Sequence, residues 1–420
     1  MKQTHVCIIG AGPGGSTAAL QLAKAGISCT LLDKAVFPRD KICGDALSGK
    51  VVSELRRIQE DFLPAIHTHT ESLPSQGIHF IAPNEKWLSI SFKSSESFFT
   101  SSTTNSVEYS GFSPGYLMRR MDFDNFLIEQ VKKNPLIDFQ EGVEVTDYQK
   151  TEAGWVITAS NQQSIETKLL IVANGAQSNF TRHIAGITTE PKHFCAGLRA
   201  YYEGVEGLDL NGFIELHFLK PFLPGYFWIF PLANGYANVG VGMLSDTISR
   251  QKINLKKSMQ ELIQTHPALQ KRFANAKLQG EIKGYGLPLG SKRRKLSGDG
   301  YMLVGDAAHL IDPFTGEGIS NAMISGRWAA DQAVKSIQNQ VYSGDFLAGY
   351  DQAVYRRLGN ELRISTRMQR LLAYPSLFNM VVNRANRNPA LKQLLSSMFN
   401  DIDLRSSLRS PTFYARLLFQ

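Results

Sequence analysis

Cysteine is scarce in this sequence, and its spacing excludes several classes of protein. The 420 residues include four cysteines: Cys7, Cys29, Cys43 and Cys195. No two of them stand in Cys-x-x-Cys spacing, so the pattern favours neither a zinc cluster nor a disulfide framework. We therefore expect no metal site, and a protein of a reducing compartment.

Long hydrophobic runs are also missing. No stretch reaches the roughly 20 uninterrupted apolar residues that a membrane-spanning helix needs. The chain passes from Met1 and Lys2 directly into the apolar run 5–9, which is too short for the hydrophobic part of a signal peptide. The sequence thus predicts a cytoplasmic protein without a membrane span.

Charge of one sign is only slightly in excess. The 45 Lys and Arg residues exceed the 37 Asp and Glu residues by 8, which favours anionic ligands or surfaces without requiring nucleic acid, so we expect no nucleic-acid partner. With 43% hydrophobic residues the composition is that of a globular protein. A chain of this length is expected to form two or three domains.

A glycine-rich turn lies near the start of the chain. Residues 5–9 predict a buried strand, 16–25 a helix and 28–33 a second strand, and between the first two stands Gly-Ala-Gly-Pro-Gly-Gly at 10–15. In this context the motif is typical of dinucleotide binding. The alternative is that the glycines merely tighten a turn.

Each part of this turn has an expected role. Gly10 permits the tight turn, Gly12 lets the backbone approach a pyrophosphate, and Gly15 allows close packing of the helix. Asp33 ends the second strand, where an acidic side chain accepts hydrogen bonds from a ribose. This pattern leaves open whether the nucleotide is FAD or NAD.

The rest of the chain predicts a second sheet and a helical end. Alternating apolar residues predict strands of an antiparallel sheet, hairpin strands at 142–168 precede an apolar run that re-enters the first domain, and a Ser/Thr-rich stretch predicts a loop. The predicted strands are 77–81, 87–92, 169–173, 195–202, 213–218, 226–231 and 236–242, the helical stretches are 122–133, 254–265, 320–340 and 345–420, and the loop is 94–106.

A second motif pair resembles a known family of flavoproteins. Residues 300–308 predict a strand that ends in Gly-Asp-Ala-Ala, and 312–319 (Asp-Pro-Phe-Thr-Gly-Glu-Gly-Ile) lead into a helix. Asp306 would bind a ribityl hydroxyl, and N–H groups near Gly316 and Gly318 would face the N1–C2=O edge of a flavin. Over residues 1–335 the chain resembles FAD-dependent oxidoreductases of the p-hydroxybenzoate hydroxylase fold.

Further segments refine this resemblance. In 116–124, Arg120 is similar to the family's FAD-contacting arginine. At Asn174-Gly175 the hydroxylases have Asp-Gly, which helps couple FAD to NADPH, so Asn174 argues against direct reduction by NAD(P)H and leaves the electron donor open. Segments 37–44 (Phe-Pro-Arg-Asp-Lys-Ile-Cys-Gly) and 226–231 (Tyr-Phe-Trp-Ile-Phe-Pro) resemble those of geranylgeranyl reductases.

In geranylgeranyl reductases these two segments lie at the flavin. The resemblance implies that Cys43 sits beside the isoalloxazine ring as a candidate catalytic residue, and that Tyr226, Trp228 and Phe230 line a hydrophobic tunnel. Alternation puts the three aromatic side chains on one face of a strand. A stripe of core residues, and a cysteine that is only a small buried hydrophobe, remain the alternatives.

The resemblance implies an α/β fold, with a Rossmann-like FAD-binding domain of the p-hydroxybenzoate hydroxylase and glutathione reductase type, an inserted antiparallel-sheet substrate domain and a C-terminal helical segment. We place the FAD-binding domain at 1–75, 115–185 and 286–340, and the substrate domain at 76–114 and 186–285. The C-terminal helical segment is 341–420. The predicted FAD-binding residues are Gly10, Gly12, Pro13, Gly14, Gly15, Asp33, Lys34, Arg39, Cys43, Gly44, Arg120, Asn174, Gly175, Gly305, Asp306, Pro313, Gly316, Glu317, Gly318 and Ile319, and the predicted substrate pocket is Tyr226, Trp228, Phe230 and Pro231.

The leading hypothesis is therefore the reduction of C=C bonds in a geranylgeranyl-type lipid by hydride from reduced FAD. One alternative is a flavin-dependent monooxygenase or halogenase that acts on an aromatic or polyketide-like substrate. Another is a prenyl-binding escort protein without enzymatic activity, which the intact loops at 10–15 and 305–318 oppose. The expected partner is a hydrophobic small molecule, and arginines around the apolar stretch 371–382 suggest peripheral attachment to the inner face of a membrane, although helices that cap the core explain that stretch equally well.

Overall fold

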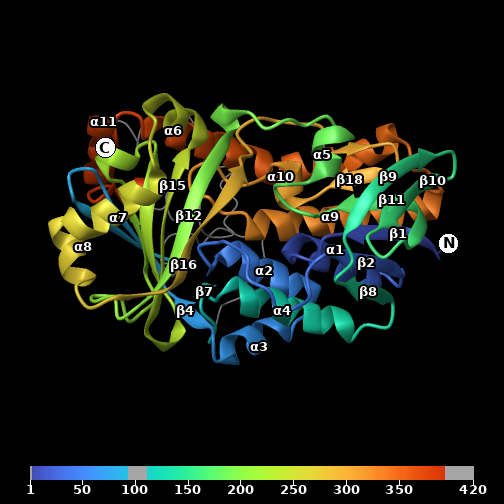
Figure 1. Ribbon diagram of the computed structural model, residues 1–420, viewed down its shortest axis with the longest axis horizontal. Helices are drawn as coiled ribbons and strands as arrows, with labels where there is room; N and C mark the ends of the chain where they lie inside the picture. Colours follow the sequence, from blue (N-terminus) through green and yellow to red (C-terminus); the bar gives the residue numbers. More distant parts are fainter. Residues whose placement is uncertain (1, 93–110, 393–420) are drawn as a thin grey trace.

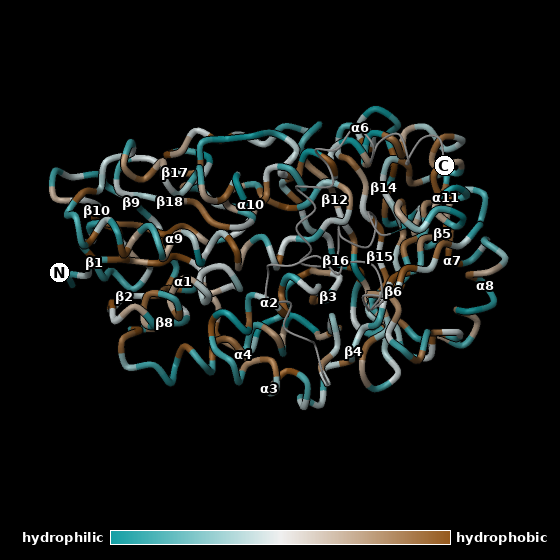
Figure 2. Tube along the Cα trace, turned by 180° about the vertical axis from the view of Figure 1, so that it is seen from behind, coloured by the Kyte–Doolittle hydropathy of each residue, from teal (hydrophilic) through white to brown (hydrophobic). Residues whose placement is uncertain are grey.

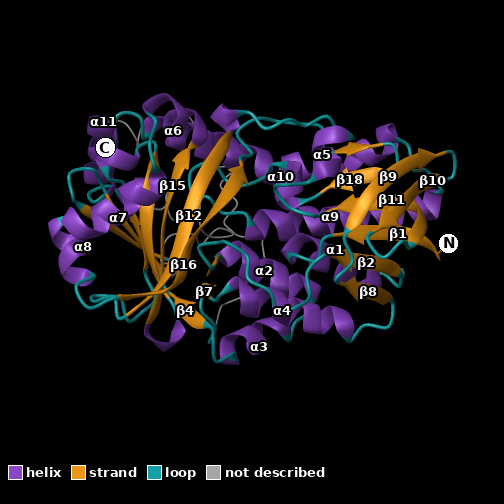
Figure 3. Ribbon diagram, viewed as in Figure 1, coloured by secondary structure: helices purple, strands orange, loops and turns teal. Residues whose placement is uncertain are grey.

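The computed structural model describes residues 2–92 and 111–392 (Figure 1). The predicted loop at 94–106 and the end of the predicted C-terminal helical segment, 393–420, lie outside the described residues. Two large sheets stand toward opposite ends of the long axis, with helices between them (Figure 3). Hydrophobic stretches run through the interior of both halves (Figure 2).

The first sheet is mostly parallel and is built on strand β1(Lys2–Ile9). Its order is β17(Ser297–Gly298), β18(Tyr301–Leu303), β11(Ser164–Val172), β1, β2(Cys29–Asp33) and β8(Ile137–Glu141), and a hairpin of β9(Val145–Thr151) and β10(Gly154–Ala159) extends from β11. The last four residues of β1 and of β11 are all buried, as expected for parallel strands covered on both faces.

Helices with small or regularly spaced apolar residues cover this sheet. Helices α1(Pro13–Lys24) and α9(Ile319–Asn339) pack closely, because a Cβ at Gly326 would stand 2.2 Å from the carbonyl oxygen of Gly14. Helix α10(Gly344–Leu371) buries apolar residues from Leu347 to Leu362 at intervals of three or four, so one side of it belongs to the core. The remaining helices here are α2(Gly49–Ile58), α3(Phe62–Thr68), α4(Arg120–Lys132) and α5(Asn179–His183).

The second sheet is antiparallel apart from one parallel pair, β13 with β5. Its order is β16(Lys277–Pro288), β12(Phe194–Glu203), β15(Tyr236–Leu244), β14(Gly225–Pro231), β13(Ile214–His217), β5(Gly77–Ile81) and β6(Trp87–Ser91). Helices α6(Ser245–Gln251), α7(Leu255–Thr265) and α8(Pro267–Arg272) follow β15, and the apolar residues of α7 share a buried cluster with those of β15. Residues on the opposite face of the sheet line the candidate site.

Short elements complete the chain. A small sheet of β3(Ala46–Leu47), β7(Gly115–Leu117) and β4(Leu73–Ser75) stands beside α2, and α11(Pro375–Ala385) lies against β6. The 3-10 helices are η1(Pro191–His193), η2(Lys220–Phe222), η3(Ala233–Gly235) and η4(Gly305–Ala308).

The predicted fold class is confirmed, but several strands were missed, namely β8, β16 and the short strands β3, β4, β7 and β17. Strand β16 forms the edge of the second sheet, and its residues 277–284 are mostly exposed. An exposed edge strand does not need the apolar alternation that a sequence pattern detects. The predicted boundary between residues 285 and 286 falls inside this strand.

Candidate functional site

The glycine-rich turn leaves room for an anion at the start of α1. Gly10 adopts φ +98°, and a Cβ there would stand 2.5 Å from the carbonyl oxygen of Ala173. A Cβ at Gly12 would meet one described atom within 4 Å, Nη2 of Arg39 at 3.8 Å. The space above Gly12 is therefore open, and it is bounded by a guanidinium group and by the positive end of a helix, a combination suited to a pyrophosphate.

Asp33 is fixed beside this turn. Its Oδ2 accepts a hydrogen bond from the N–H of Ala11 at 2.7 Å, and its Oδ1 accepts one from the N–H of Ala35 at 2.8 Å. Each oxygen keeps a lone pair for a ribose hydroxyl. Lys34 extends outward, with its side chain 70% exposed and 3.5 Å from Glu144.

The second motif forms a tight loop before α9. Oδ1 of Asp312 accepts hydrogen bonds from the N–H groups of Phe314 and Thr315, at 3.0 and 2.9 Å. Gly316 then adopts φ +72°, and a Cβ there would stand 2.8 Å from the hydroxyl oxygen of Tyr226. The loop thus brings the N-terminus of α9 against the aromatic strand β14.

A cavity of about 190 Å³ lies between the second loop and β14, and it reaches the glycine-rich turn at Pro13. The predicted residues that line it are Pro13, Cys43, Gly44, Arg120, Tyr226, Trp228, Phe230, Asp306, Pro313, Gly316, Glu317, Gly318 and Ile319. Those outside its lining are Gly10, Gly12, Gly14, Gly15, Asp33, Lys34, Arg39, Asn174, Gly175, Pro231 and Gly305. The residues that line the cavity come from both large domains, and those outside the lining include the dinucleotide turn. The role of each residue toward a cofactor or substrate remains a prediction.

The aromatic side of the cavity comes from alternate residues of β14. The rings of Tyr226 and Trp228 are 6.1 Å apart between centroids, and those of Trp228 and Phe230 are 6.2 Å apart. Phe227 and Ile229, between them, belong to the buried cluster on the other face of the sheet. The strand therefore supplies a wall of the cavity and a part of the core at once.

Arg120 is held by a buried ion pair. Its Nε and Nη2 donate to the two oxygens of Asp124, both at 2.6 Å, and Arg39 donates to the same carboxylate at 2.7 Å. Burial disfavours the charged carboxylate, but the two guanidinium groups outweigh it and lower the pKa of Asp124. Arg120 thus reaches the cavity as a fixed cation.

The predicted cysteine lies next to this cation. Burial is the main cause of a raised pKa of the Cys43 thiol, and the charge of Arg120 only partly opposes it. Cys43 is therefore a thiol at neutral pH rather than a nucleophilic thiolate.

Lys41 and Glu317 place two more charges at the cavity. Lys41 pairs with Asp306 at 3.0 Å, and this pair outweighs burial, so the pKa of Lys41 is raised. Burial raises the pKa of Glu317, which accepts a hydrogen bond from Ser48.

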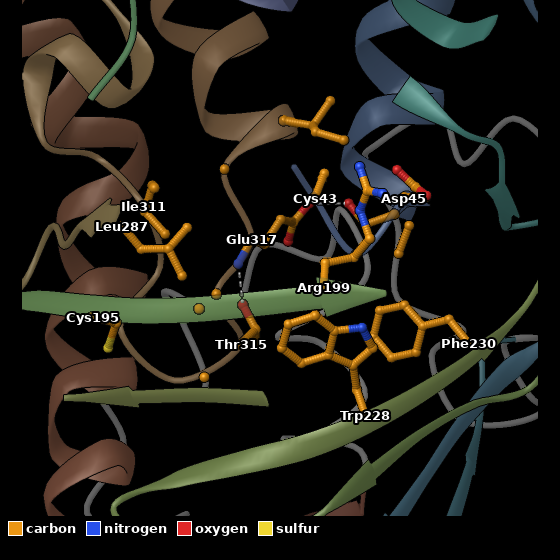
Figure 4. Close-up of a pocket in the computed structure, with 18 of the residues that line it drawn as sticks. Cys43, Asp45, Cys195, Arg199, Trp228, Phe230, Leu287, Ile311, Thr315 and Glu317 are labelled. Carbon is orange, nitrogen blue, oxygen red and sulfur yellow. Dashed lines mark hydrogen bonds between the residues drawn. The ribbon is translucent and has the colours of Figure 1, made fainter. Parts of the chain in front are cut away.

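Sequence reasoning missed three polar residues at or directly behind the wall of the cavity: Asp45, Arg199 and Asn238. Figure 4 shows the Arg199 side chain beside Asp45, and the rings of Trp228 and Phe230 next to each other. Asn238 lies behind these residues and donates to the carbonyl oxygen of Cys43 at 2.7 Å and to Asp45 at 2.8 Å. Asp45 directly follows the recognised Cys-Gly segment and could have been noticed, whereas Arg199 and Asn238 stand in otherwise apolar strand patterns.

Comparison with known proteins defines the class first. Residues 3–198 match the family described as FAD binding domain, and residues 210–280 match the geranylgeranyl reductase catalytic domain. A crystal structure of a geranylgeranyl bacteriochlorophyll reductase-like protein from Thermoplasma acidophilum has the same fold, with TM-score 0.77 and 24% identity, over 95% of this chain and 100% of that one. The chain is an FAD-dependent oxidoreductase.

Two relatives then give the family. Digeranylgeranylglycerophospholipid reductase of Methanococcus vannielii is 30% identical over 381 residues, which cover 87% of each chain. Menaquinone reductase of Mycobacterium tuberculosis is 28% identical over 410 residues, which cover 95% of this chain and 92% of the relative. The chain belongs to the geranylgeranyl reductase family.

Proposed function

We propose that this protein reduces C=C bonds of a long isoprenoid lipid with hydride from reduced FAD. The observation that carries the proposal is the cavity described above, which runs from the loop before α9 to the aromatic face of β14. Its other lining residues include Ile214, Leu216 and Leu287. An apolar space that opens onto the expected flavin position suits an unfunctionalised hydrocarbon chain.

The residues present fit FAD. The open space over Gly12 suits the pyrophosphate, Asp33 suits the ribose, and Asp306 suits the ribityl chain. FAD, when bound, supplies the hydride that the side chains of a protein cannot provide. The N-terminus of α9 and the Arg120 cation would stabilise negative charge on it.

The protein's own part is to place the alkene and to exclude water. The rings of Trp228 and Phe230 form one wall, and Phe230 packs so closely on Gly44 that a Cβ at Gly44 would stand 2.9 Å from the ring. Such a wall fixes the chain close to the Cys43–Gly44 segment. Holding the two reactants together in this way lowers the entropic part of the barrier.

We infer the substrate class from the names of two relatives. One acts on a digeranylgeranylglycerophospholipid and another on menaquinone, according to their names. These lipids differ in their head groups and share an isoprenoid chain. We therefore propose the isoprenoid chain as the recognised part.

An anaerobic absorption experiment tests the function. Purified protein is reduced with dithionite, or in parallel with NADPH, and then receives digeranylgeranylglycerophospholipid, menaquinone or a fully saturated lipid as the control. Reoxidation of the flavin by an unsaturated lipid without O₂, together with a saturated product, is the expected result. Reoxidation only with air and an aromatic substrate would instead indicate a monooxygenase.

We also propose that the protein binds the surface of a membrane through the start of α11. Tyr374, Leu377 and Met380 are 65%, 41% and 48% exposed, and Leu372, two residues before Tyr374, lines the cavity. Arg370 is exposed just before them and would face anionic lipids. No described helix is long and apolar enough to cross a membrane.

Point substitutions test this surface better than removal of the whole segment, because one side of α10 lies in the core. Changing Tyr374, Leu377 and Met380 together to Ser is expected to abolish sedimentation with anionic vesicles. Leu210→Ser is the matched control, since Leu210 is 98% exposed elsewhere. Equal sedimentation of both variants would contradict the proposal.

A further inference from the structure

Asp45 is a buried carboxyl group that faces the cavity. It is 0% exposed and adopts φ 66°, a conformation that side chains other than Gly, Asn and Asp rarely take. Its Oδ2 accepts hydrogen bonds from the hydroxyl of Tyr201 at 2.7 Å and from Asn238 at 2.8 Å, and its Oδ1 accepts one from the N–H of Arg120 at 3.2 Å. Three donors therefore fix this group at the cavity wall.

Tyr201 connects Asp45 to the outside of the cavity. Its side chain is partly exposed and is not part of the cavity lining. The ring lies against two cations, with the guanidinium carbons of Arg199 and Arg119 at 4.0 and 4.8 Å from its centroid. A partly exposed side chain thus donates a hydrogen bond to a carboxyl group that lines the cavity.

We propose that Asp45 gives the substrate its proton and that Tyr201 resupplies this proton from solvent. The inference rests on the proposed function. One alkene carbon receives hydride from reduced FAD, and the other takes the carboxyl proton of Asp45, so that two C–H bonds replace the π bond. Tyr201 then passes its hydroxyl proton to the carboxylate and recovers one from water.

The charges around Asp45 suit such a donor. Burial raises the pKa of Asp45 to about 6, against the opposing effects of Tyr201, Asn238 and Arg199 and the Arg120 N–H. Part of the population is therefore protonated near neutral pH, and a general acid works best when its pKa is near the working pH. The nearby Arg199 guanidinium stabilises the carboxylate that remains after transfer.

Single-turnover kinetics test the two roles separately. Asp45→Asn keeps the size and tolerates positive φ, and it should slow the first reoxidation of dithionite-reduced enzyme by an isoprenoid lipid about 100-fold or more. In enzyme equilibrated at pH 5, where most Asp45 starts protonated, Tyr201→Phe should lower the steady-state rate more than the single-turnover rate, because only later turnovers need a new proton. Tyr202→Phe is the matched control, since Tyr202 packs on Phe273 on the other face of β12.

The outcomes distinguish this inference from the proposed function. If wild-type enzyme is reoxidised by the lipid and Asp45→Asn reacts within about threefold of it, the inference is wrong. A large loss with Glu317→Gln instead would assign the proton to Glu317, another carboxyl group of the cavity. If no isoprenoid lipid reoxidises the wild type, the proposed function fails.

Infrared spectroscopy tests Asp45 without turnover. The C=O band of a protonated carboxyl group that is absent in Asp45→Asn should titrate near pH 6 in the wild type. In Tyr201→Phe the midpoint should rise, because the carboxylate loses a hydrogen-bond donor. Absence of any such band between about pH 5 and 8 would show an ionised Asp45 and overturn the proposal.

Discussion

Replacing Asn238 should remove the hydrogen bonds that join Trp228, in the wall of the cavity, to the Cys43–Asp45 segment. Asn238 is 0% exposed, accepts a hydrogen bond from Nε1 of Trp228 at 2.9 Å, and donates to the carbonyl oxygen of Cys43 and to the carboxylate of Asp45. One side chain thus holds three parts of the site. Asn238→Ala removes all three bonds at once.

The expected fall in the free energy of unfolding depends on which buried polar groups lose their hydrogen-bond partners. Asp45 keeps its bonds from Tyr201 and from the N–H of Arg120. The Trp228 N–H and the Cys43 carbonyl lose their partners, and each orphaned buried group costs about 1–3 kcal/mol. Both residues line the cavity, so water can reach the groups in part. We therefore expect the free energy of unfolding to fall by about 2–3 kcal/mol.

Urea unfolding measures this change, and Trp228 fluorescence should shift to longer wavelength as the indole N–H meets water. Asn275→Ala is the matched control, because Asn275 makes one exposed hydrogen bond, to Glu206 at 3.2 Å. A loss below about 0.5 kcal/mol in Asn238→Ala, or one equal to that of the control, would refute the argument.

Three other substitutions test the cofactor end and the buried charges. Gly10→Ala should give protein without flavin absorbance, because its Cβ would stand 2.5 Å from a carbonyl oxygen, whereas Gly26→Ala, at φ +74° with nothing within 4 Å, should stay yellow. Asp124→Asn should lower the free energy of unfolding at pH 7 by about 3 kcal/mol, since it leaves Arg120 buried and unpaired. Because the pKa of Asp124 is lowered on folding, this loss should shrink as the pH falls below about 4; an unchanged loss in acid would count against it. Burial lowers the pKa of His309 to about 4, so unfolding, which releases a histidine that protonates near 6.5, becomes easier as the pH falls. Between pH 7 and 5 the wild type should lose about 2 kcal/mol more than His309→Asn in urea titrations, and parallel curves would contradict this.

Much of the fold follows from local patterns in the sequence. The strand at 5–9, the turn at 10–15 and the acid at position 33 predict β1, α1 and β2 because each depends on neighbouring residues. Strand β16 was not predicted because its side chains are largely exposed at a sheet edge and show no apolar alternation. The proline at position 13 begins α1 three residues before the predicted start, since proline suits the first turn of a helix.

The site could be predicted only in part, because its contacts join distant segments. The aromatic alternation in 226–231 predicts one face of a strand, and this face does line the cavity. No pattern near Asn238 indicates that it meets Asp45, which lies 193 residues away in the chain. A buried polar residue is recognised as a site residue only when its partners are known.

Strand register explains why these particular residues meet. Asn238 stands directly opposite Tyr201 on one neighbouring strand and Phe230 on the other, so the three side chains form a row on one face of the sheet. The next row pairs Gly240 with Arg199 and Trp228, and a Cβ at Gly240 would stand 2.2 Å from the Trp228 ring. Glycine in the middle strand therefore leaves room for the indole ring, while asparagine two residues earlier supplies the polar atoms. Two positions on one face of β15 thus place both the Asp45 carboxyl group and the Trp228 ring at the cavity.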